Sequence, residues 1–220
     1  MYEEMIGAHT VMRRGAALVC TSYQRLVGGE PVDVKALVGT TRWLIGFVHR
    51  YHSSEDVLFW PVLIDLFPAA VRELNQINIE HQALEAELHA LARAVDAIAA
   101  PESSVERTRA LEIVGQATVS GLPAAQRVQE ILVRHFADEE PVLLELFPKV
   151  PDRDIVRLRK TIVRGASRSG LHLVFGLMED PDRVPGYELL MRNLPRSTRW
   201  MRPVLLARYR SVKKALADYS

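Results

Sequence analysis

The segment HRYHSSEDVLFWP, residues 49–61, places two histidines and two carboxylates directly before a run of apolar residues. Residues three or four apart share one face of a helix, so His52 can point the same way as Glu55 or Asp56. The apolar face of this helix is defined by Leu44, Ile45, Val48, Phe59 and Leu63. On a wheel of about 100° per residue, His52 and Glu55 both fall within about 30° of the centre of that face. The segment therefore predicts a helix that directs an imidazole and a carboxylate into a protein core.

The rest of the chain is also typical of helices, because apolar residues recur every three or four positions and strand-like alternation is nearly absent. We expect an all-α protein with long helices at about residues 2–26, 34–66, 70–99 and 103–146. Asp33 is a candidate N-cap for the second helix, and Pro61 should bend that helix or break its last turns. A further interruption is expected near Gly121 and Pro123. Short connections between long helices favour an antiparallel, up-down four-helix bundle.

Residues 151–220 differ from the first 150, because they are rich in arginine and are interrupted by several prolines. We expect two or three further helices there, at about residues 153–178, 186–192 and 199–218. Residues 171–178 are too apolar for a free linker, so this region should pack on the bundle or contact a partner. The predicted organisation is a bundle at residues 1–150 that carries a metal centre, followed by a C-terminal helical extension at residues 151–220.

Composition restricts the possible functions and the compartment. The net charge of +1 gives no overall basic field for nucleic acid, and the tail arginines are most simply a solvated face. Cys20 is the single cysteine, so one chain can form neither a disulfide nor a cysteine zinc site, which fits a reducing cytoplasm. The first residues do not have the pattern of a signal peptide, and no apolar run reaches about 18 residues. We therefore expect a cytoplasmic protein without a membrane span.

Each of the four expected bundle helices carries a histidine in or near its apolar face: His9, His52, His81 and His135. A single buried histidine is usually a hydrogen-bonded core residue, but four of them with nearby carboxylates need compensation. Unpartnered buried polar groups cost about 1–3 kcal/mol each, and charged groups cost more. A shared cation would remove this cost. Histidine and carboxylate ligands without thiolate suit iron, manganese or zinc, and more than four of them favour two ions over one tetrahedral zinc.

The ordered set of four motifs resembles the hemerythrin-like (HHE cation-binding) family of non-haem di-iron proteins. The motifs are His9-Thr10-Val11-Met12-Arg13, His52-x-x-Glu55-Asp56 before Leu58-Phe59-Trp60-Pro61, Glu80-His81-Gln82-Ala83-Leu84-Glu85, and His135-Phe136-Ala137-Asp138-Glu139-Glu140. The resemblance covers about residues 1–150. It implies a four-helix bundle with two oxo- or hydroxo-bridged irons as the cofactor, with manganese or zinc as weaker alternatives. It also implies ligand roles for His9, His81, His135, Glu139 and the Glu55 region.

One departure concerns the second helix, where the family usually has a histidine four residues before the glutamate. Tyr51 stands there, and His52 follows one residue later. Either His52 serves with Glu55, or the register shifts and His52 pairs with Asp56, and Tyr51 could bind ferric iron through its phenolate. The candidate metal ligands are therefore His9, His52, Glu55, His81, His135 and Glu139. Weaker candidates are His49, Tyr51, Asp56 and Glu85.

The resemblance implies a protein that binds or turns over a small oxidant, such as O2, NO or H2O2, in an apolar pocket. Oxygen binding, a response to oxidative stress and a catalase-like decomposition of peroxide all fit this design, and we assign no separate catalytic residue. One alternative is a metal- or redox-responsive regulatory module whose C-terminal helices contact a partner protein. Another is a structural bundle without metal. Neither a membrane nor a nucleic acid is an expected partner, although the tail arginines leave nucleic acid as a weaker alternative.

Overall fold

The computed structural model describes residues 1–99, 106–156 and 169–217, and within these ranges the chain is helical and has no strand. The first part contains α1 (Tyr2–Val27), α2 (Val34–Ser54), the π-helix η1 (Glu55–Phe59), α3 (Trp60–Leu66), the 3-10 helix η2 (Pro68–Ala70), α4 (Val71–Ala99), α5 (Glu106–Gln116), the π-helix η3 (Ala117–Gly121), α6 (Leu122–Leu146) and the 3-10 helix η4 (Phe147–Lys149). The C-terminal part contains α8 (Leu171–Glu179), α9 (Tyr187–Asn193), α10 (Arg196–Trp200) and α11 (Arg202–Ala217). The all-α prediction is confirmed.

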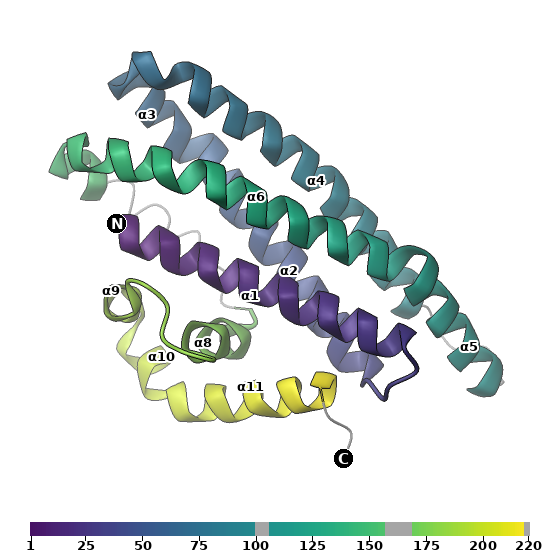
Figure 1. Cartoon of the computed structure of the whole chain (residues 1–220). Coiled ribbons are helices and arrows are strands. Elements are labelled where there is room, and N and C mark those ends of the chain that lie inside the picture. Colours follow the sequence, from purple (N-terminus) through teal and green to yellow (C-terminus); the bar gives the residue numbers. More distant parts are fainter. Residues whose placement is uncertain (100–105, 157–168, 218–220) are drawn as a thin grey trace.

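The long helices α1, α2, α4 and α6 form a four-helix bundle. Helices α1 and α4 each pack against both α2 and α6 (Figure 1). The colour gradient of Figure 1 shows that α1 and α4 run in one direction and that α2 and α6 run in the opposite direction. The predicted up-down topology is therefore confirmed. None of the described helices is long and apolar enough to cross a membrane.

The structure shows how the second helix begins and how the second and fourth helices are interrupted. Asp33 caps α2, because its Oδ1 accepts a hydrogen bond of 2.7 Å from the Ala36 N–H. The break expected at Pro61 is a π-helix rather than an end, since the helix continues to Leu66 after η1. The interruption expected near Gly121 is likewise the π-helix η3, after which α6 begins. The start expected at Ser103 or Ser104 lies outside the described residues.

Two apolar clusters fill the bundle, and a polar layer separates them. The larger cluster includes Tyr23, Leu44 and Leu88, and the smaller one includes Phe59 and Leu63. Helices α1, α4 and α6 contribute to both clusters, whereas α2 contributes to the larger one and its continuation in η1 and α3 contributes to the smaller one. The candidate ligands lie where the two contributions meet, and Phe136 beside His135 belongs to the larger cluster. The flanking pairs are Met5 and Met12 around His9, Val48 and Phe59 around His52 and Glu55, Ile77 and Leu84 around His81, and Leu132 and Leu143 around His135 and Glu139.

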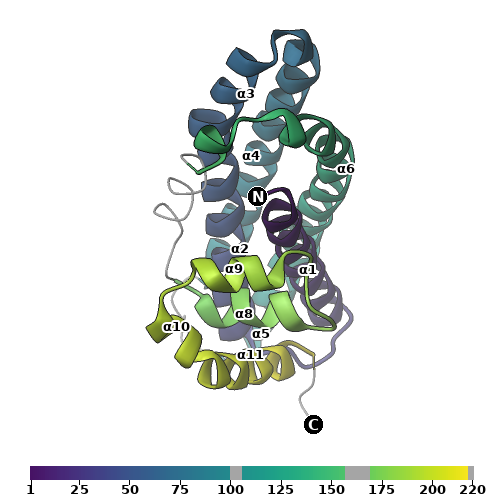
Figure 2. The same cartoon turned by 90° about the vertical axis from the view of Figure 1, so that its left-hand side faces the viewer.

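The C-terminal helices lie along the side of the bundle formed by α1 and α2 (Figures 1 and 2). Helix α8 packs between α1 and α11, and α11 also reaches α2. Gly176 on α8 permits this packing, because a Cβ there would lie 1.9 Å from the ring of Tyr209 on α11. Arg14 on α1 fixes the tail through hydrogen bonds of 3.0 Å to the carbonyl oxygen of Leu177 and 2.7 Å to that of Asp182.

The predicted helix boundaries in the tail are partly wrong. A single helix at 153–178 was expected, but a turn at residues 169–170 precedes α8, and Gly170 has a φ of +68° that an α-helix does not contain. The middle of that expected helix lies outside the described residues. The helix expected at 199–218 is divided into α10 and α11, and the helix expected at 186–192 corresponds to α9.

Candidate metal centre

The polar layer consists of two groups of buried side chains that could each hold a metal ion. One group is His52, His81 and His135, and the other is His9, Glu55 and Glu139. Within each group, one nitrogen or oxygen of every residue lies within 4.8 Å of the others. These are the six residues that the sequence indicates as candidate ligands, and the fold brings all of them together from α1, α2, η1, α4 and α6.

The three histidines of the first group turn the same nitrogen toward one another. His52 Nδ1 lies 3.0 Å from the Val48 carbonyl oxygen, His81 Nδ1 lies 2.6 Å from Asp56 Oδ1, and His135 Nδ1 lies 3.0 Å from Glu80 Oε2. A carbonyl or carboxylate acceptor at Nδ1 requires the proton on that nitrogen, which leaves Nε2 as a lone-pair acceptor. In the neutral imidazole each Nε2 therefore faces the centre with its lone pair.

Two of these nitrogens lie at hydrogen-bond distance from each other. His81 Nε2 and His135 Nε2 are 3.1 Å apart, and His52 Nε2 is buried without a hydrogen-bond partner among the described residues. Burial, followed by the charges of His81 and His135, lowers the pKa of His52 well below its usual value, so its imidazole is neutral. Burial acts to lower the pKa of His135, but Glu139 and Glu80 outweigh burial and raise it. Imidazoles that converge through Nε2 are suited to bind a cation once that nitrogen carries no proton, and the acceptors at Nδ1 fix their orientation.

His9 in the second group is held from both sides. Its Nδ1 lies 3.1 Å from Glu140 Oε1, which is also 2.6 Å from Arg13 Nη2. Its Nε2 lies 2.9 Å from the Tyr51 hydroxyl. Burial, and then the charges of Glu55 and Glu139, raise the pKa of Tyr51 well above its usual value. Tyr51 is therefore a protonated phenol that donates to His9 Nε2 when no cation is present.

The two carboxylates carry the clearest indication of a missing partner. Glu55 is 1% exposed and Glu139 is 0% exposed, and none of their four oxygens has a hydrogen-bond partner among the described residues. Such groups are costly in a protein interior unless a cation balances them. Burial, and then the charge of Glu139, raise the pKa of Glu55 well above its usual value. Burial acts to raise the pKa of Glu139 too, but His9 and His135 outweigh burial and lower it.

Glu139 and Glu55 lie between the two groups. Glu139 Oε2 is 3.2 Å from His135 Nε2 in the first group, without the alignment of a hydrogen bond, and 3.7 Å from His9 Nε2 in the second. Glu55 Oε2 is 3.8 Å from His81 Nε2. Both carboxylates are thus within reach of both groups, which is the arrangement that two neighbouring cations would need. Four imidazoles and two carboxylates suit iron, manganese or zinc.

The π-helix η1 sets the direction of the second-helix carboxylates. The Trp60 N–H donates to the carbonyl oxygen of Glu55, five residues earlier, so the backbone widens just before Pro61, which has no N–H. The same pattern precedes Pro123, where the Leu122 N–H donates to the Ala117 oxygen. As a result Glu55 reaches the centre while Asp56 reaches His81 Nδ1, so the two carboxylates have separate contacts.

Aromatic side chains enclose the layer. Phe136 stacks on His9 with ring centroids 4.0 Å apart and an interplanar angle of 12°, and the Arg13 guanidinium lies 5.0 Å above the same ring. The Trp60 ring lies 6.3 Å from that of His81. These rings restrict the movement of the His9 and His81 imidazoles and exclude water beside them.

The weaker candidates have other positions. Tyr51 and Asp56 contact His9 and His81, as described above, and they do not belong to the two groups. His49 and Glu85 lie further toward the surface, where His49 Nδ1 is 3.0 Å from Glu85 Oε2. Sequence reasoning missed the roles of Glu80 and Glu140, which hold His135 and His9. The sequence signal for these roles was that Glu80 directly precedes His81 and that Glu140 directly follows Glu139.

Comparison with known proteins agrees with this geometry. A family model described as the Hemerythrin HHE cation binding domain matches residues 1–150, which includes all six residues of the two groups. No curated protein and no solved structure matches the chain.

Proposed function

This protein belongs to the hemerythrin HHE cation-binding family, and from that premise we propose that its polar layer is a di-iron centre that binds or turns over a small oxidant such as O2, NO or H2O2 in the cytoplasm. The observation that supports this most strongly is the set of unpartnered polar atoms in the layer. His52 Nε2 and all four oxygens of Glu55 and Glu139 are buried close together, and none of them has a hydrogen-bond partner among the residues that the structure describes.

The ligand roles in this proposal follow from the contacts of each side chain. His52, His81 and His135 would hold one ion through Nε2, and His9 would hold the second. Glu55 and Glu139 would supply carboxylate oxygens to both, which is supported by their distances to nitrogens of both groups. Iron held in this way supplies a centre that exchanges electrons with a small oxidant. Manganese or zinc would fit the same donors, but they are weaker alternatives for oxidant chemistry.

Several side chains around the ligands have roles that do not depend on contact with the oxidant. Asp56 and Glu80 keep the Nδ1 protons of His81 and His135, so that the Nε2 atoms stay free to bind a cation. The Tyr51 hydroxyl oxygen lies 2.9 Å from His9 Nε2, and Tyr51 would bind a ferric ion through its phenolate after loss of the hydroxyl proton. Phe136 excludes water beside His9, which favours small uncharged ligands.

The proposal is tested by the metal content per chain and the visible spectrum of protein purified from iron-supplemented cells, recorded before and after addition of peroxide. We expect about two irons per chain and a charge-transfer band that responds to peroxide. The variant His52→Ala should lose iron, whereas His89→Ala, which alters an exposed histidine on α4, should keep it. Protein without metal, or with one zinc and a featureless spectrum, would contradict the proposal.

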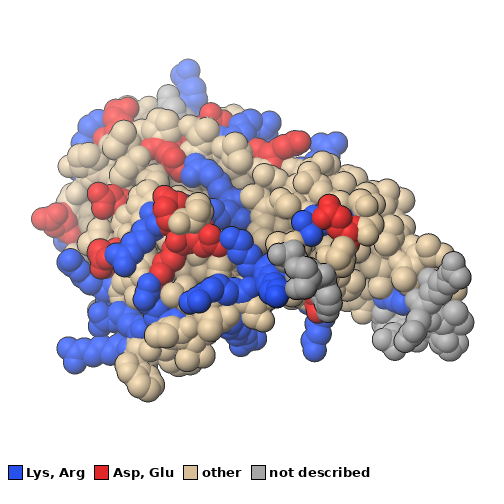
Figure 3. All heavy atoms as spheres, turned by 60° about the horizontal axis from the view of Figure 1, so that its bottom comes forward, with Lys and Arg blue, Asp and Glu red and all other residues tan. Residues whose placement is uncertain are grey.

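A regulatory role for the C-terminal helices is a second candidate, which one observation favours. Trp200 is 86% exposed, and Met201 and Val204 beside it are also exposed. Figure 3 shows Lys and Arg side chains, with Asp and Glu among them, on the face turned forward from the bottom of Figure 1, and Arg196, Arg199 and Arg202 are neighbours of Trp200 in the sequence. An exposed tryptophan among cations is a suitable contact for an acidic partner protein. Trp200→Ser should then abolish partner binding without a change in metal content, whereas oxidant chemistry at the centre would be unaffected.

A further inference from the structure

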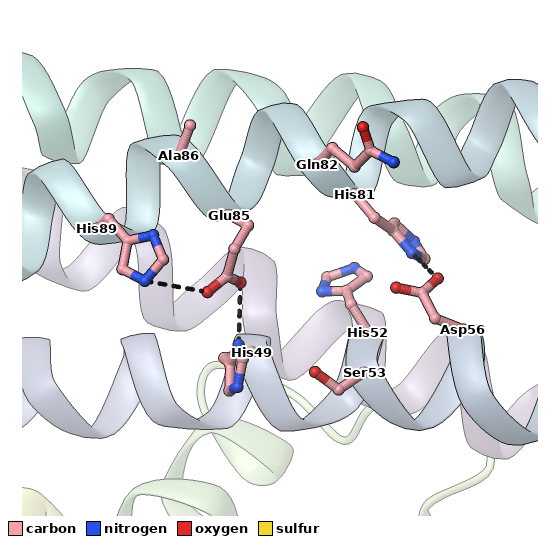
Figure 4. A pocket seen from close by; sticks show the side chains of 9 residues that line it. All are labelled: His49, His52, Ser53, Asp56, His81, Gln82, Glu85, Ala86 and His89. Atoms are coloured by element: carbon pink, nitrogen blue, oxygen red, sulfur yellow. Dashed lines mark hydrogen bonds and ion pairs between the residues drawn. The ribbon is translucent and has the colours of Figure 1, made fainter.

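A pocket of about 460 Å³ leads from the surface toward the first histidine group. It lies between α2 and α4, and its inner end is formed by His52 and His81 (Figure 4). His49, Glu85 and His89 stand at its outer end, and Asp56 lies beside His81. His52 is buried, and its unpartnered Nε2 belongs to a side chain that lines this pocket. The pocket thus connects a buried candidate ligand with a set of surface side chains of the same chemical type.

The three side chains at the outer end already contact one another. Glu85 Oε2 lies 3.0 Å from His49 Nδ1, and Glu85 Oε1 lies 3.5 Å from His89 Nε2. The side chains of His49 and His89 are 52% and 68% exposed, so both can reorient around Glu85 at little cost. Two imidazoles on one carboxylate are the donors that a divalent first-row cation prefers.

The charges along the pocket favour a cation. Asp56 and Glu85 line it, and among the described residues that line it there is no Lys or Arg. The side of the centre beside His9 is different, because the Arg13 guanidinium there bonds Glu140 and lies over Phe136. The Arg13–Glu140 ion pair leaves no net negative charge at that side, whereas the pocket attracts a cation, since a cleft lined by one sign of charge raises the local concentration of counter-ions.

A cation that enters the centre needs polar side chains along its route, because the candidate metal ligands lie between two apolar clusters. Moving a bare divalent ion through an apolar region costs many kcal/mol of hydration energy. Side chains that replace water molecules one at a time reduce this barrier. We propose that His49, Glu85 and His89 form a docking site that captures a divalent cation and passes it along the pocket to His52 and His81. This inference rests on the proposed metal centre.

The experiment measures the rate at which metal-free protein takes up Co2+, which is air-stable and develops visible absorbance in a protein site. The variants are Glu85→Gln and the double variant His49→Ala/His89→Ala. The matched control is Glu87→Gln, which removes the same charge from the same helix outside the pocket. Co2+ removal by a chelator and the final cobalt content per chain are measured for each protein.

We expect both pocket variants to take up Co2+ about tenfold more slowly at low salt, the lower end of the effect of a charged cleft on association rates. The difference should shrink at about 1 M salt, where the Debye length falls to about 3 Å. Removal should slow by the same factor, because a docking site on the route changes both directions equally and leaves the final cobalt content unchanged. The control should behave as the wild type.

Two results would overturn the docking site. One is uptake by the pocket variants at the wild-type rate. The other is a lower final cobalt content with unchanged removal, since this would make the three residues permanent ligands rather than a route. Failure of the wild-type protein to bind Co2+ at all would instead overturn the proposed metal centre, so the two failures are distinguishable.

Discussion

Replacing Glu55 by glutamine should change the stability of the metal-free and metal-loaded protein in opposite directions. Glu55 is 1% exposed, and neither of its oxygens has a hydrogen-bond partner among the described residues. An unsatisfied buried polar group costs about 1–3 kcal/mol, and a charged one costs more. The glutamine amide keeps the size of the side chain and removes the charge, but it is still polar. We therefore expect Glu55→Gln to raise the free energy of unfolding of the metal-free protein by roughly 1 kcal/mol at pH 7.

The sign of the pH dependence follows from the raised pKa of Glu55, which has burial as its first cause and the charge of Glu139 as its second. A carboxyl group whose pKa is higher in the folded state destabilises the fold at pH values above its unfolded pKa of about 4.3. The penalty grows between that value and the folded pKa, and it is absent below about pH 4. The contribution of Glu55→Gln to stability should therefore disappear as the pH falls toward about 4.

With metal bound, the wild-type protein should be more stable than Glu55→Gln, which is the reverse of the order without metal. A cation that binds only the folded state adds about 2.7 kcal/mol when its free concentration is 100 times its Kd. Wild-type protein should gain this stability, and Glu55→Gln should gain less because it lacks one carboxylate. The assay is urea unfolding followed by helical circular dichroism, with a chelator and with Co2+, and Glu87→Gln is the control. An equal loss of stability in both conditions would refute the reasoning and make Glu55 an ordinary structural residue.

Three further changes test other parts of the molecule. Phe136→Ala should lower the free energy of unfolding by about 3–5 kcal/mol, because this fully buried ring stacks on His9, and Phe136→Leu should restore most of the loss in the same urea titration. Gly176→Ala should lower the Tm and make the tail sensitive to limited proteolysis, because its Cβ would overlap the Tyr209 ring; an unchanged Tm would contradict this packing. Tyr51→Phe should remove any phenolate-to-iron absorption band while iron content stays near that of the wild type, and a band that persists would exclude Tyr51 as a ligand.

Helical periodicity placed the second-helix ligands in the core, and the resemblance to a family supplied the ligand roles on the other three helices. His52 and Glu55 were expected to point into the core because of their place on the apolar face, and both are buried there. The choice between Glu55 and Asp56 was left open from sequence, and the structure gives each carboxylate a different contact. Glu55 lies in the second group, and Asp56 holds His81 from outside it. The ligand roles themselves stay predictions that metal analysis must test.

Contacts between distant parts of the chain were beyond sequence reasoning. Glu140 holds His9 from 131 positions away and also contacts Arg13, and no local pattern connects these residues. The π-helices were missed because a change from an i−4 to an i−5 hydrogen bond does not alter composition or periodicity over a long window. Both occur just before a proline, at Pro61 and Pro123, which is a local signal that a reader of the sequence could use.

The polar layer between the two apolar clusters has a consequence for how the protein opens. Each end of the bundle buries its own apolar side chains. When no cation balances the carboxylates of the layer, we therefore expect the two ends to unfold with little cooperativity between them. Amide hydrogens in α3 and η4, at the smaller cluster, should then exchange with solvent independently of those in the middle of α1. A cation that ties all four helices together at the layer would merge the two ends into one exchanging unit, so that metal sets which parts of the chain open together.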